Sequence, residues 1–86
     1  MGAITKDVKL ADGSIVHLDI SELRRREWED FWSSPEGENR VIAKFSNMSL
    51  DEVKDMLDRD FRLLVQEFIK LRNKPLDDPN SQSAST

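Results

Sequence analysis

Apolar and polar residues alternate on both sides of Ala11-Asp12-Gly13, and this pattern constrains the fold more than any other part of the chain. A three-residue loop pairs Leu10 with Ser14 and Val8 with Val16. One face of the resulting hairpin then carries Val8, Leu10, Val16, Leu18 and Ile20, and the other carries Asp7, Lys9, Ile15, His17 and Asp19. A two-residue Asp-Gly loop would mix the two sets, since a shifted register moves side chains to the opposite face. Three-residue loops also favour glycine in the left-handed conformation at their third position. We therefore predict a hairpin over about residues 6–20.

A two-stranded hairpin is marginal in water, so its apolar face must pack on helices. Ser21 is a good N-cap residue and predicts a helix over about 21–33. SSPEGEN interrupts that pattern, because proline and glycine punctuate helices, and a short second helix is expected over about 38–46. Ser49 and Glu52 form a capping box that opens a third helix, with Met48 and Val53 at the positions of a hydrophobic staple. The fold class predicted is α+β, with an N-terminal hairpin packed on three to four short helices.

The third helical segment covers about residues 50–73 and could be one helix or two. Aspartate is a poor interior residue and a good cap, so we favour a break at 58–60, the segment Asp58-Arg59-Asp60. Pro75 ends the helical pattern, and the polar residues 76–86 read as a disordered tail. Residues 1–75 are expected to form a single small domain.

The composition limits both the core and the function. The chain has 86 residues, of which 37% are hydrophobic and 35% are charged. A chain of this size buries roughly 60% of its unfolded surface, so self-association or a partner is expected. There is no cysteine, no apolar run long enough for a membrane span and no secretory signal pattern. A net charge of −4 disfavours binding to nucleic acid, which requires neutralisation of phosphates. We expect a soluble cytoplasmic domain.

Few residues suggest catalysis. His17 is the only histidine and is expected to face solvent next to Asp7 and Asp19. Asp58-x-Asp60 and Asp77-Asp78 are the densest carboxylate pairs, but neither has the spacing of a known metal loop. No glycine-rich phosphate loop is present. We expect no enzymatic activity, no cofactor and no metal site.

The one basic run, Arg24-Arg25-Arg26, has carboxylates at helical spacing. Glu22 with Arg26, Arg25 with Glu29 and Arg26 with Asp30 are all i, i+4 pairs. We therefore interpret the run as a salt-bridged, solvated helix face.

Trp28, Phe31 and Trp32 lie close together on the first predicted helix. In one interpretation both tryptophans pack under the hairpin as core. In the other, one of them stays partly exposed as an interface anchor, since tryptophan is enriched at binding hot spots. The residues that we expect to contact a partner are Trp28, Phe31, Trp32, Phe61, Val65 and Phe68.

The order of the motifs points to one family. A hairpin with an Asp-Gly turn is followed by E-L-x-x-x-E-W-x-x-F, from Glu22 to Phe31. Next comes S-N-M-S-L-D-E-V, from Ser46 to Val53, where many relatives have T-G-L-S-x-E-E-L. D-F-R-L-L-V-Q-E-F follows, from Asp60 to Phe68, before Lys74-Pro75. From about Val8 to Pro75 the chain resembles the small tail assembly chaperones of long-tailed bacteriophages. Asn47 departs from the pattern where glycine is frequent, but asparagine tolerates left-handed geometry.

This resemblance implies binding rather than catalysis. Such proteins keep the tape measure protein, a long and largely helical rod, soluble until the tail tube protein polymerises around it. The implied partners are the tape measure protein and the tail tube protein, and the implied location is the host cytoplasm, with no place in the mature virion. An acidic domain with an apolar helix face could shield amphipathic helices in this way.

Two other classes share these compositional features. One is a generic protein-interaction module, such as an antitoxin-like or regulator-binding domain. The other is a nucleic-acid binder, which the net charge disfavours. A neighbouring gene for a very long helical protein would favour the chaperone, and one for a nuclease would favour the interaction module.

Overall fold

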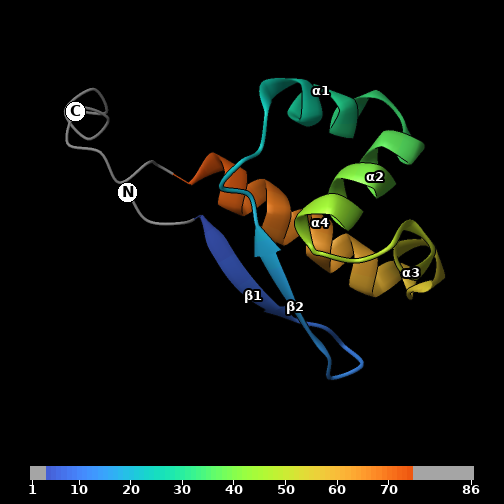
Figure 1. The fold of residues 1–86 in the computed structure, drawn as a ribbon. Coiled ribbons are helices and arrows are strands. Elements are labelled where there is room, and N and C mark those ends of the chain that lie inside the picture. The colour runs from blue at the N-terminus through green and yellow to red at the C-terminus, as the bar shows by residue number, and fades with distance from the viewer. Residues whose placement is uncertain (1–3, 75–86) are drawn as a thin grey trace.

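A computed structural model describes residues 4–74 of the chain. Strands β1 (Thr5–Lys9) and β2 (Ile15–Asp19) form an antiparallel hairpin, and four helices follow. These are α1 (Arg25–Ser33), α2 (Pro35–Phe45), α3 (Leu50–Asp55) and α4 (Asp58–Asn73). In Figure 1, α4 crosses the middle of the molecule beside the hairpin, and α1, α2 and α3 follow one another around it. The predicted α+β class, a hairpin packed on three to four helices, is confirmed.

The hairpin has the predicted register. Val8 pairs with Val16, and the Leu10 N–H donates to the Ser14 carbonyl at 2.8 Å. Gly13, the third loop residue, has a φ of +94°, which is the left-handed conformation expected of it. All five side chains of the predicted inner face are buried, whereas those of the opposite face are exposed.

The first helix begins later than predicted. Its N-cap is Arg24 rather than Ser21, and the Arg24 backbone N–H donates to the Glu27 carboxylate at 2.9 Å. Ser21 is already engaged in a turn: its hydroxyl donates to Asp19 Oδ1 at 2.7 Å and accepts from the Ile4 N–H at 2.9 Å. Because these bonds hold Ser21 against the end of the hairpin, it cannot cap the helix.

The second helix begins earlier than predicted, at Pro35 instead of residue 38. Ser34 is its N-cap and accepts a hydrogen bond from the Gly37 N–H at 3.0 Å. Proline suits the first helical position, where its missing N–H would have no intrahelical partner. Ser34 to Gly37 therefore form the N-cap and first turn of α2, and the interruption predicted at SSPEGEN is limited to Ser34, between the last residue of α1 and the first of α2.

The predicted break in the third helical segment is present, two residues earlier than expected. Helix α3 ends at Asp55, Met56 and Leu57 are extended, and α4 begins at Asp58. The capping box between Ser49 and Glu52 is confirmed, with bonds of 3.1 and 2.8 Å. Asn47 has a φ of +57°, the left-handed geometry that asparagine tolerates.

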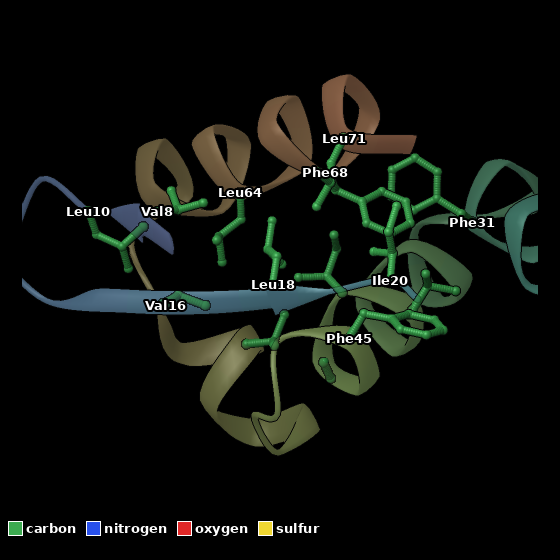
Figure 2. Close-up of a cluster of buried hydrophobic side chains, with 14 residues drawn as sticks. Val8, Leu10, Val16, Leu18, Ile20, Phe31, Phe45, Leu64, Phe68 and Leu71 are labelled. Atoms are coloured by element: carbon green, nitrogen blue, oxygen red, sulfur yellow. The ribbon is translucent and has the colours of Figure 1, made fainter. Parts of the chain in front are cut away.

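The core joins the hairpin to all four helices. Figure 2 shows buried side chains from both strands meeting those of the helices. Its most deeply buried large members are Leu18, Ile42, Leu64 and Phe68. The tail predicted for residues 76–86 lies outside the described residues.

Candidate protein-binding surface

Four large apolar side chains remain exposed among residues 4–74. They are Ile15 at 67%, Trp32 at 60%, Leu57 at 53% and Leu50 at 36% of their full accessible area. Scattered exposed apolar residues are normal, so the informative ones are those supported by a rigid apolar surround. Trp32 contacts two aromatic rings, and Leu57 lies one helical turn before the half-buried Phe61.

Trp32 projects from α1 against two other aromatic rings. Its ring meets Trp28 edge-on at 5.5 Å and Phe31 edge-on at 5.0 Å between centroids. Phe31 is buried and lies 4.9 Å from the ring of Phe68 on α4. Edge-to-face geometry is favourable for aromatic pairs. Trp32 is therefore fixed to the core on one side and open to solvent on the other.

Trp28 is half-buried and belongs mainly to the fold. It stacks on Phe31 at 5.7 Å, contacts Phe68 at 5.9 Å and carries the Arg72 guanidinium 4.5 Å from its ring centre. The cation–π contact ties α4 to α1. The two tryptophans thus have different environments, and the interpretation in which both are core is wrong for Trp32.

Helix α4 presents a second apolar row, made by Leu57 at its N-cap, Phe61 and Val65. These residues are four apart, so they lie one above another on the helix surface. Phe61 and Val65 are half-buried and line an open depression of about 240 Å³ between α2 and α4. We call it the α2/α4 depression; its lining residues are Glu38, Asp58, Phe61, Arg62, Val65 and Gln66.

The charges in the α2/α4 depression are not balanced by close pairs. Partial burial raises the pKa of Glu38 above its ordinary value, and the negative charge of Asp58 raises it further. Arg62 lines the same depression, but among the ion pairs of residues 4–74 it forms none with either carboxylate. Within the described residues, the two carboxylates of the depression therefore form no ion pair, although Arg62 lines the same depression.

The predicted contact residues fall into three groups. Trp32 is exposed, and Trp28, Phe61 and Val65 are half-buried. Phe31 and Phe68 are 2% and 0% exposed, so they support the surface from beneath and have almost no area to offer a partner. Sequence reasoning missed Leu57 and Glu38. Leu57 could have been found from its position one turn before Phe61.

The basic run is less paired than predicted. Arg25 and Glu29 lie 3.6 Å apart, as expected. Asp30 instead pairs with Arg40 of α2 at 3.0 Å, and Glu22 precedes the helix, so the predicted pairs of Arg26 were wrong.

His17 is exposed and lies 2.6 Å from Asp7. In the described part of the chain, no group of three or more potential ligands is positioned to hold a metal ion.

No helix within residues 4–74 has the length and apolar composition needed to cross a membrane. No protein-family model matches the chain, and neither does any curated protein or solved structure.

Proposed function

We propose that this protein is a tail assembly chaperone of a long-tailed bacteriophage, which binds the tape measure protein and keeps it soluble in the host cytoplasm. It would leave before the virion matures. The proposal is supported by the motif order from Val8 to Pro75 and by the surface of the folded domain. The observation that carries it is Trp32, a tryptophan that is 60% exposed although it packs edge-on against two aromatic rings.

Trp32 suits this function because its side chain is already partly ordered in the free protein. Its two edge-on neighbours restrict the ring before any partner arrives, so binding loses little side-chain entropy. Hot-spot tryptophans contribute about 2 kcal/mol or more, which corresponds to roughly 30-fold in affinity. Amphipathic helices of a rod-like partner would cover such an anchor with their apolar side chains.

Co-expression with the tape measure protein tests the proposal. The wild-type chain should move that protein into the soluble fraction, and Trp32→Ala should lose most of this effect while remaining folded. Ile15→Ala is the matched control, because Ile15 is at least as exposed as Trp32 but lies on the solvent face of the hairpin. A tape measure protein that stays insoluble beside the wild-type chain would refute the proposal. Equal activity of both variants would rule out Trp32 as the anchor.

A further inference from the structure

The α2/α4 depression combines apolar side chains with two carboxylates that form no ion pair among residues 4–74. Phe61 and Val65 supply the apolar part of the lining, Glu38 lies on the α2 side, and Asp58 is the first residue of α4. Neither carboxylate takes part in any ion pair or side-chain hydrogen bond found within residues 4–74. A cation placed between them would be attracted by both charges, in a site that is partly shielded from water.

The state of Glu38 supports this argument. Its carboxylate is partly desolvated and faces a like charge, and both effects raise its pKa. Arg62 lies one turn after Asp58 on α4 and lines the same depression, but among the described residues it forms no ion pair with either carboxylate. The charged form of Glu38 is therefore disfavoured in the free protein, and a positive charge from a partner would stabilise it.

The shape of the depression indicates what kind of partner fits. Its volume of about 240 Å³ is below the roughly 300–1,000 Å³ of small-molecule sites, and it is open rather than enclosed. Leu57, Phe61 and Val65 form a row along α4 with a spacing of one helical turn. A second helix lying along this row presents its own side chains at the same spacing, which is how helices pack.

We propose that the α2/α4 depression docks a basic amphipathic helix, whose apolar side chains cover Phe61 and Val65 and whose lysine or arginine lies between Glu38 and Asp58. The inference rests on the proposed function, because it assigns the chemistry of the partner segment that this chaperone holds. The depression is then a second contact surface. Trp32 provides an aromatic contact, whereas Glu38 and Asp58 favour a partner with positive charge.

Two designed peptides of about 18 residues, or five helical turns, test the docking directly. Both have the same leucine face. One has lysines beside that face and the other has glutamates at the same positions. Fluorescence anisotropy of labelled peptides should show binding of the lysine peptide and at least about tenfold weaker binding of the glutamate peptide.

The protein variants use a matched pair with equal net charge. Glu38→Gln with Asp58→Asn removes two charges from the depression, and Glu22→Gln with Asp51→Asn removes two exposed charges elsewhere. The first pair should bind the lysine peptide about tenfold more weakly, and the second should bind nearly as the wild type does. Glu38→Gln alone should fold at least as stably as the wild type, because it removes a partly desolvated charge. A merely structural role for Glu38 would predict lower stability.

The outcomes separate this inference from the proposed function. Equal effects of the two double variants, equal binding of the two peptides, or no binding of either would overturn the docking site. These results do not depend on the tape measure protein. If the lysine peptide binds as described but the tape measure protein stays insoluble, the docking site stands and the chaperone function falls. If the tape measure protein is held equally by both double variants, the chaperone function stands and the docking site falls.

Discussion

Replacing Gly37 with alanine should destabilise the protein, although alanine is the better helix former. Gly37 lies in the first turn of α2 and is buried against α1. A Cβ atom at this position would lie 2.1 Å from the backbone carbonyl oxygen of Asp30 and 2.9 Å from Asp30 Oδ1. The side chain could rotate away, but the carbonyl belongs to the backbone of α1. That carbonyl also accepts a hydrogen bond from the Ser33 hydroxyl at 2.8 Å.

Two opposing contributions determine how Gly37→Ala changes the free energy of unfolding. Carbon and oxygen atoms normally come no closer than about 3.3 Å, so α1 and α2 must separate by about 1 Å. Overpacking of this kind costs about 1–3 kcal/mol. Replacing glycine with alanine stabilises a helix by about 1 kcal/mol through its higher intrinsic propensity. Because the clash is with backbone, the cost is expected near the upper end, and the net loss is about 2 kcal/mol. For a domain of this size, that loss lowers the melting temperature by about 8–16 °C.

Thermal denaturation followed by circular dichroism measures this loss. Asn39→Ala is the control, because it raises helix propensity two residues further along α2, where the only side-chain bond is a long one of 3.4 Å to Glu36. It should change the free energy of unfolding by less than about 0.5 kcal/mol. A Gly37→Ala protein as stable as the wild type, or more stable, would show that the close approach of α1 and α2 is not as described.

Three further predictions concern the hairpin and its contacts with α4. Gly13→Val should lower the melting temperature, because a β-branched residue at a φ of +94° costs about 1–2 kcal/mol or more. Asp60→Ala should cost about 1–3 kcal/mol in urea denaturation, since the Ala11 N–H donates to this buried carboxylate at 2.9 Å, whereas Asp60→Asn, which retains an oxygen acceptor, should cost less. The Lys6 ammonium, 2.6 Å from Glu67 Oε1, holds the pKa of Glu67 below its ordinary value. The contribution of this ion pair to stability is complete above about pH 4.5 and is lost as the pH falls through the lower, folded-state pKa, so Lys6→Ala should reduce the acid dependence of the unfolding midpoint.

The sequence predicted those features that depend on short-range periodicity or on a complete local motif. In the hairpin, each residue must face either the core or solvent, so only one register separated Val8 and Val16 from Asp7 and His17. The capping box was predictable because Ser49 and Glu52 satisfy each other without help from the rest of the fold.

The features that sequence reasoning missed depend on contacts between distant segments. Serine is a residue type that favours the N-cap, but the hydroxyl of Ser21 accepts from the N–H of Ile4, which directly precedes β1. Asp60 was considered only as a helix cap or an acid, yet it is 2% exposed and accepts from the hairpin loop 49 positions away. Asp30 pairs with α2 rather than with its own helix because Gly37 brings α2 close to it. No local pattern contains this information.

The same close approach connects the two proposed contact surfaces. Asp30 and Trp32 are two residues apart on α1, and Gly37 and Glu38 are neighbours on α2. The contact between Asp30 and Gly37 therefore fixes the position of the exposed tryptophan relative to the carboxylate of the α2/α4 depression. A partner helix that used both contacts would depend on that spacing. If Gly37→Ala separates α1 from α2, it should weaken holding of the tape measure protein by more than its loss of stability explains, and it should leave binding of the short lysine peptide to the depression less affected.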